Sequence, residues 1–290
     1  MQANLTYAGR THAFDPAAPL DISLPLAAGL TNQPNCFWAE PLTVETIRVG
    51  SFVGSVALGG STNYQRVSLT PHGNGTHTEC YGHISPDPAA TLDKCLTQFL
   101  FVAQLISVAP RPQENGDLVV MLADVRAATS RPPPGAASLS KKEGEPNDSA
   151  PRVTGSPSFL ERGPGGEVPP VLILRTLPND EAKRARHYSG TNPPYIELAL
   201  AEFLAAENVR HLLLDLPSVD REEDAGQLLA HHAFWRYPSR PRCGATITEL
   251  IFVPDTIPDG LYLLNLQVTS LVLDASPSRP VLYALRELKI

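Results

Sequence analysis

Residues 71–84, PHGNGTHTECYGHI, hold three of the eight histidines of the chain and one carboxylate. The four side chains are His72, His77, Glu79 and His83. Imidazole nitrogens and carboxylate oxygens are ligands that borderline divalent cations accept readily. Four such groups in so short a stretch predict a metal site. For each histidine taken singly, an alternative stays open, in which it completes a hydrogen bond in the core.

Hydrophobic periodicity indicates the elements that would position these groups. Residues 64–69 alternate polar and apolar side chains, which predicts a strand. If the strand resumes after the glycines, His77, Glu79 and His83 point to one face, because side chains two residues apart share a face. His72 has the wrong parity for that face, so we expect a β-bulge at the glycines to bring it in.

The run from His72 to His83 resembles a signature of the metal-dependent cyclase/kynurenine formamidase family, which includes bacterial arylformamidases and isatin hydrolases. That signature reads H-x-G-T-H-x-D-x-x-x-H. The chain departs from it by one residue inserted before Gly75-Thr76-His77, and by Glu79 in place of aspartate. Because glutamate adds a methylene, Glu79 is expected to bridge two ions less well, which leaves open whether the site holds one ion or two.

A second part of the chain resembles the same family. Residues 215–220 match its D-x-P-S-V-D segment, residues 230–234 match A-H-x-x-[LF] on a helix, and Glu249 matches a late carboxylate on a strand. The family pattern favours His231 over His232 as the ligand. The choice between them stays open because the helix face is not determined by the sequence. A solvated or capping histidine near a helix end is the alternative for this pair.

The resemblance also implies roles for these residues. His72, His77 and Glu79 would hold one ion, Zn²⁺ or Mn²⁺, and Glu79 would share a second with His231 and Glu249. Such an ion lowers the pKa of bound water toward about 7 and polarises a carbonyl group.

Two catalytic groups are implied, His83 as the proton shuttle and Glu249. For His83, a hydrogen bond to a ligand carboxylate is the structural alternative. By resemblance, Phe37 and Trp38 lie over the substrate as an aromatic wall, and for both a place in the core is the alternative.

The expected fold is α/β. Buried strands at residues 171–175 and 211–215 flank a helical pattern at residues 195–207, which predicts a partly parallel sheet with a right-handed crossover. The resemblance, which covers about residues 18–270 without 129–170, implies a swivelling β/β/α domain with a mixed sheet and flanking helices. We expect a single domain over residues 1–290. Residues 129–170 are rich in Pro, Gly, Ser and charge, and they predict an insertion or mobile loop within that domain, with a lid over the site as the alternative.

Composition limits the classes of partner. The net charge of −7 argues against nucleic-acid binding. No apolar run approaches the roughly 20 residues that span a bilayer, so no membrane partner is expected. The first residues lack a basic start followed by an apolar block, so we expect no secretory signal. The four cysteines are widely spaced, which favours reduced thiols in a cytoplasmic protein.

The sequence therefore predicts a divalent-metal-dependent hydrolase that cleaves a linear or cyclic amide, as an arylformamidase does, in a small-molecule substrate. Lactone or ester hydrolysis, or cyclisation at the same site, is one alternative. A non-catalytic metal-binding relative is another. The resemblance also implies a homo-oligomer, a dimer or a tetramer.

Overall fold

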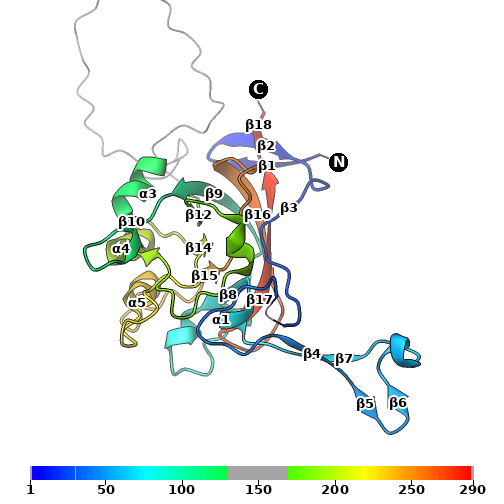
Figure 1. Ribbon diagram of the computed structural model, residues 1–290. Coiled ribbons are helices and arrows are strands. Elements are labelled where there is room, and N and C mark those ends of the chain that lie inside the picture. Colours follow the sequence, from blue (N-terminus) through cyan, green and yellow to red (C-terminus); the bar gives the residue numbers. More distant parts are fainter. Residues whose placement is uncertain (1, 30, 130–168, 289–290) are drawn as a thin grey trace, which may run out of the picture.

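The computed structural model describes residues 2–29, 31–129 and 169–288. An eight-stranded mixed sheet dominates it, and an additional pairing between β16 and β17 closes seven of its strands into a ring (Figure 1). The eighth strand, β3, extends the sheet beyond β17 as an edge. In sheet order the strands are β16 (Gly260–Val268), β9 (Leu100–Val108), β12 (Val171–Thr176), β14 (His211–Leu214), β15 (Thr246–Glu249), β8 (His77–Cys80), β17 (Ala275–Ala284) and β3 (Leu20–Asp21).

Strands β9, β12, β14 and β15 are parallel, and β9, β12 and β14 each contain an apolar run. All six residues of β12 are buried, as expected for a strand covered on both faces. Leu172 and Leu174 contribute to one core, and Val171 and Ile173 to a second core on the opposite face, because side chains alternate along a strand. The predicted mixed α/β fold is confirmed.

Helices α3, α4 and α5 lie together on one side of the sheet (Figure 1). In α4, LALAEFLAA, the side chains of Leu200, Ala201 and Leu204 are fully buried against the core that includes Leu172. No described helix is long and apolar enough to cross a membrane. The helices are α1 (Pro71–Asn74), α2 (Leu92–Cys95), α3 (Leu122–Thr129), α4 (Leu198–Ala206) and α5 (Leu229–Trp235), with 3-10 turns η1 (Val56–Leu58), η2 (Tyr81–Ile84) and η3 (Glu181–Ala185).

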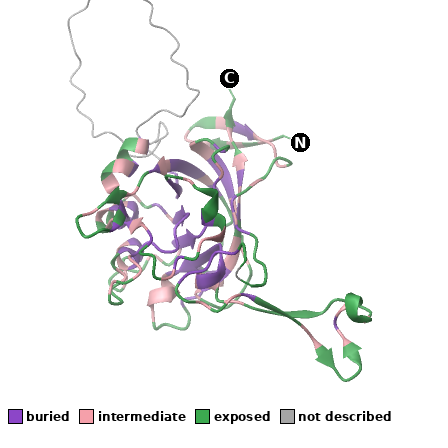
Figure 2. Ribbon diagram, viewed as in Figure 1, coloured by how far each residue is buried: buried purple, intermediate pink, exposed green. Residues whose placement is uncertain are grey.

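Smaller sheets lie outside the ring. Two of them have three strands each: β1 (Ala3–Tyr7), β2 (Arg10–Phe14) and β18 (Arg286–Glu287); then β10 (Arg111–Pro112), β11 (Leu118–Val120) and β13 (Tyr195–Ile196). Two hairpins, β4 (Thr43–Thr46) with β7 (Gln65–Ser68) and β5 (Arg48–Val49) with β6 (Phe52–Val53), form an arm, residues 43–68, that projects away from the body (Figure 1). Figure 2 shows that most of this arm is exposed.

The predicted course of the histidine motif is wrong in two respects. His72 lies on the helical turn α1, not at a β-bulge, because Pro71 starts a turn at its first position. Strand β8 ends at Cys80, and His83 lies on the 3-10 turn η2 rather than on a continued strand. Position 82 in this turn suits only glycine, because a Cβ atom there would stand 1.9 Å from the carbonyl oxygen of Ala90.

The predicted insertion at residues 129–170 falls almost wholly outside the described residues, of which only 129, 169 and 170 belong to it. The extent of the predicted domain over residues 1–290 stays a prediction.

Candidate metal centre

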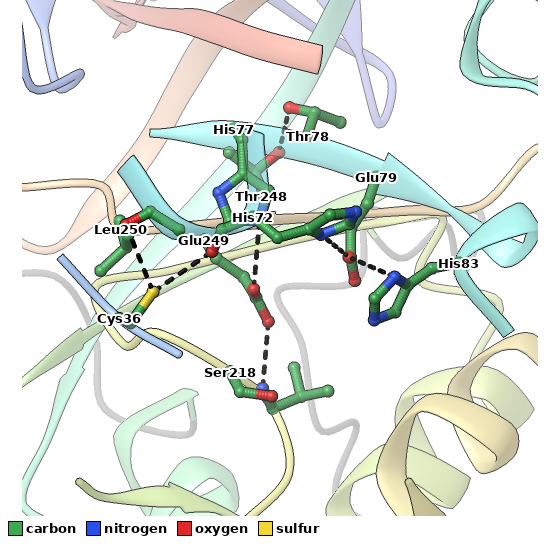
Figure 3. Close-up of polar contacts among 12 residues, drawn as sticks. Cys36, His72, His77, Thr78, Glu79, His83, Ser218, Thr248, Glu249 and Leu250 are labelled. Carbon is green, nitrogen blue, oxygen red and sulfur yellow. Dashed lines mark hydrogen bonds and ion pairs between the residues drawn. The ribbon is translucent and has the colours of Figure 1, made fainter. Parts of the chain in front are cut away.

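The pairing of β8 with β15 places two predicted ligands opposite each other. Glu249 is the register partner of His77 in this antiparallel ladder, and the two side chains point to the same face (Figure 3). His77 Nε2 lies 3.3 Å from Glu249 Oε2. The other oxygen of Glu249, Oε1, accepts a hydrogen bond of 3.1 Å from the main-chain N–H of Val219. Glu249 is therefore held in place from the loop that follows β14.

His77 has the geometry of a ligand. Its Nδ1–H donates to the carbonyl oxygen of Gly75 at 2.9 Å, which leaves the lone pair on Nε2. That Nε2 is buried and has no hydrogen-bond partner. A buried polar atom without a partner costs free energy unless something satisfies it, and a cation beside Glu249 would do so. The residues of the site therefore fit a divalent ion.

Helix α5 brings His231, rather than His232, to the site. His231 Nε2 lies 3.1 Å from Glu79 Oε1. Its Nδ1–H donates to Asp220 Oδ2 at 2.6 Å, an arrangement typical of metal-binding histidines. The same carboxylate accepts the main-chain N–H of Ala230 and of His231 at the start of the helix. His232 instead points to the carbonyl oxygen of Tyr237.

Glu79 lies at the centre of the cluster. It is almost fully buried, and its two oxygens face different parts of the chain. Oε1 faces His231, while Oε2 lies 3.0 Å from His72 Nδ1 and 3.9 Å from His83 Nδ1. Figure 3 shows Glu79 with His72 and His83 beside it. Two sets of atoms that include Glu79 are close enough to hold an ion: those of His72, His77 and Glu79, and those of Glu79, His83 and His231.

Asp274, which sequence reasoning missed, joins the cluster from the connection between β16 and β17. Its Oδ2 lies 2.9 Å from His72 Nε2 and 3.4 Å from His83 Nδ1. In the sequence, the feature that could have indicated this site residue is a single aspartate after the apolar residues 271–273. Its meaning depended on recognising β17, which pairs with β8 but contains two prolines that obscure a strand pattern.

The charges of the site shift the pKa values of its two buried glutamates, Glu79 and Glu249, in opposite directions. Burial would raise the pKa of Glu79, yet the charge of His83 and the hydrogen bonds from His231 and His72 hold it well below its ordinary value. Glu249 has its pKa raised, first by burial and then by repulsion from Glu79. Two buried carboxylates that repel each other favour a cation between them.

The histidines respond to the same carboxylates. Burial would lower the pKa of His72, but its hydrogen bonds with Asp274 and Glu79 raise it to about 10. Burial likewise opposes the effect of Asp220 and Glu79 on His231, whose pKa is raised to about 10. Positive charge is therefore favoured at both positions, whether a proton or a metal ion supplies it.

A cavity of about 770 Å³ opens over the cluster. Phe37 lines it, and the place of Trp38 over the substrate stays a prediction. Phe37 and Trp38 both have positive φ, 55° and 52°, and Cζ2 of Trp38 lies 3.8 Å from where a Cβ atom on Gly190 would stand. Trp38 is 65% exposed. The cavity is lined by Phe37, His72, Glu79, His83, Ser218, Arg221, Glu222, Glu223, Asp224, Ala225, Gly226, Leu228, His231 and Glu249.

Comparisons with known proteins bear on the family resemblance and on the fold. A family model described as "Putative cyclase" matches residues 20–141. The resemblance to the cyclase family is confirmed. Among solved structures, a predicted metal-dependent hydrolase from Bacillus stearothermophilus is 16% identical with a TM-score of 0.52, over 92% of this chain and 98% of that one.

Two isatin hydrolases share the cyclase-family fold. Isatin hydrolase A from Ralstonia solanacearum is 14% identical with a TM-score of 0.55, over 92% of each chain. An isatin hydrolase bound to the product analogue thioisatinate is 12% identical with a TM-score of 0.56, over 93% of this chain and 94% of that one. At these identities the comparison shows a common fold.

Proposed function

We propose that this chain is a divalent-metal-dependent hydrolase that cleaves a linear or cyclic amide, with arylformamidase-like activity. The observation that carries the proposal is the bare, buried Nε2 of His77, which faces Glu249 and lies beside Glu79 and His72 below an open cavity. Three carboxylates and four imidazoles meet there from three separate parts of the sequence.

In this proposal His72, His77 and Glu79 hold one ion, and Glu79, His231 and Glu249 hold a second where two are bound. The donor set of nitrogens and carboxylate oxygens suits Zn²⁺ or Mn²⁺. When bound, such an ion polarises a carbonyl group and lowers the pKa of water to about 7. Asp220 orients His231, and the Val219 N–H orients Glu249, so both side chains are fixed before any ion arrives.

The remaining residues of the site have roles in proton transfer and in binding. His83 lies at the edge of the cavity and is partly exposed, so it can exchange protons with substrate and solvent. Glu249 is the second catalytic group in the proposal. Phe37 provides an apolar wall for an aromatic or otherwise flat substrate.

The structural neighbours support amide cleavage at the level of chemistry. Isatin hydrolases act on isatin, a cyclic amide, and they share this fold at 12–14% identity. Lactone or ester hydrolysis, or a cyclisation, would use the same groups and is an outcome of the test below.

We also propose that the protein is a cytoplasmic homo-oligomer and that its arm binds a second copy of the chain. A two-stranded ribbon is marginally stable on its own in water, and this arm exposes apolar side chains along its length. The length of the arm, residues 43–68, is similar to the about 20–30 residues that each partner contributes to a standard interface. The exposed apolar residues are Val44, Val49, Phe52, Val56, Leu58, Tyr64 and Val67.

The test combines metal analysis with a substrate panel. Protein stripped by a chelator is reloaded with Zn²⁺ or Mn²⁺ and assayed on an N-formyl arylamine, an aryl lactam and an aryl lactone. We expect turnover of an amide that depends on the added metal, and loss of both metal and turnover in His77→Ala. Preference for the lactone would replace amide cleavage by ester chemistry. Stoichiometric metal without turnover of any substrate would indicate a non-catalytic relative.

A further inference from the structure

Asp274 is anchored to the histidine motif although it lies almost 200 positions later in the chain. Its carbonyl oxygen accepts the main-chain N–H of Cys80 at 3.0 Å, at the end of β8. Gly82 makes room for it, since a Cβ atom on Gly82 would stand 3.1 Å from the Asp274 Cβ. The main chain of Asp274 is therefore held against the segment that carries His83.

One oxygen of Asp274 faces two imidazole rings. Oδ2 lies 2.9 Å from His72 Nε2 and 3.4 Å from His83 Nδ1. The two rings are 4.3 Å apart between centroids and inclined by 34°, so they lie nearly side by side around the carboxylate.

An ionised carboxylate only accepts hydrogen bonds. The nitrogens that face Asp274 must therefore carry hydrogen, and in a neutral imidazole the opposite nitrogen is then bare. For His72 the bare atom is Nδ1, which lies 3.0 Å from Glu79 Oε2. A nitrogen lone pair and a carboxylate oxygen at this distance favour positive charge between them, which a proton or a metal ion can supply. For His83 the bare atom is Nε2.

We propose that Asp274 is a positioning residue that sets the tautomers of both histidines: it leaves His72 Nδ1 free to bind metal beside Glu79, and leaves His83 Nε2 free to accept a proton in the cavity. The role of His83 as a proton acceptor in catalysis rests on the proposed function. The positioning itself does not, because it follows from the contacts of Asp274 alone. Asp274 lies outside both segments that match the family signature.

The deciding measurement is the protonation of the His83 ring in the full chain loaded with Zn²⁺. Long-range ¹H–¹⁵N correlation of the imidazoles, with His83 assigned through His83→Gln, should report the Nδ1–H form in the wild type. In Asp274→Asn the amide can donate to Nδ1, so we expect a shift toward the Nε2–H form. Asp274→Glu should restore the Nδ1–H form at least in part. Unchanged His83 signals in both Asp274→Asn and Asp274→Ser would overturn the proposal.

Turnover and metal content distinguish the positioning role of Asp274 from the role of a metal ligand, and they also test the proposed hydrolase activity. We expect kcat of Asp274→Asn to fall about 10- to 100-fold with KM changed less than about threefold, at unchanged Zn²⁺ stoichiometry. Loss of one equivalent of Zn²⁺ that excess Zn²⁺ does not restore would make Asp274 a ligand and would overturn a positioning role. The matched control is Asp87→Asn, an exposed carboxylate near η2, which should change neither signals nor rate. A tautomer shift in a protein without turnover would uphold the role of Asp274 and count against the hydrolase.

Discussion

At the scale of single residues, each of the predicted ligand histidines has an oxygen partner on the ring nitrogen that points away from the candidate metal centre. The Gly75 carbonyl accepts from His77, Asp220 accepts from His231, and Asp274 faces His72. Such partners fix the tautomer and the ring orientation before metal binds, and their loss weakens metal affinity about 10- to 100-fold in proteins generally. The site is therefore preorganised by groups that do not touch the ion themselves.

The two adjacent histidines of α5 offer a matched pair of variants. His231→Ala removes a nitrogen 3.1 Å from Glu79, and it leaves Asp220 buried without its partner. We expect at least a tenfold loss of affinity for Zn²⁺ or Mn²⁺, measured by competition with a chromogenic chelator. His232→Ala removes only a contact with the Tyr237 carbonyl and should bind metal like the wild type. Equal affinity of the two variants would remove His231 from the site.

At the scale of elements, β14 has a buried ion pair just after its end and a buried histidine at its start. Asp215, just after the strand, accepts from Lys183 Nζ at 2.9 Å and from the N–H and hydroxyl of Thr176. These contacts fix the chain where it turns into residues 216–220, the segment that reaches the metal centre. At the other end, His211 Nδ1 pairs with Thr246 Oγ1 at 2.8 Å, and its Nε2 is buried without a hydrogen-bond partner.

His211 gives the protein a defined sensitivity to acid. Burial, with the nearby charges of Arg210 and Arg242, lowers its folded pKa to about 3 from an ordinary 6.5. Between these values the unfolded chain binds a proton that the folded chain does not. The contribution of His211 to the free energy of unfolding is therefore fully present above about pH 6.5 and is lost as the pH falls toward 3. From pH 6.5 to 5 this loss amounts to about 2 kcal/mol.

The measurement is urea unfolding at pH 7 and at pH 5, with the metal-free wild type compared with His211→Asn. The wild type should lose more unfolding free energy than the variant over this interval, because the other titrating groups are common to both proteins. An equal loss in the two proteins would show that His211 does not carry the effect.

At the scale of the whole molecule, the closed ring of strands and its helices form the body, and the arm is the part that the body leaves uncovered (Figure 2). The arm leaves the body just after Phe37 and Trp38 and returns just before His72. An interface that holds the arm would therefore also hold the two segments that border the cavity.

Charged substitutions on the arm should separate the copies. The double variant Val49→Asp with Val67→Asp places charges at two strongly exposed apolar positions, and we expect at least about a 100-fold weaker association, since buried hot-spot side chains each contribute about 2 kcal/mol or more. Light scattering coupled to size exclusion gives the mass. Leu198→Asp, at an exposed leucine of α4, is the control. A monomeric wild type, or an arm variant that stays associated, would contradict the proposal.

Much of the site was determined by residue types that lie close together in the sequence. The types and order of His72, His77 and Glu79, and the match around residues 215–234, predicted a cation site of this family because ligand chemistry depends on local spacing. Strands such as β12 were equally predictable, since their apolar runs are long enough to identify a buried element.

Only the tertiary structure decided which distant groups meet. It selected His231 over His232 through the rotation of α5, and it brought Asp274 to His72 through the pairing of β17 with β8. It also placed His83 on a turn rather than a strand. The physical reason is that these outcomes depend on main-chain torsions and on the packing of segments far apart in the chain, neither of which local spacing records.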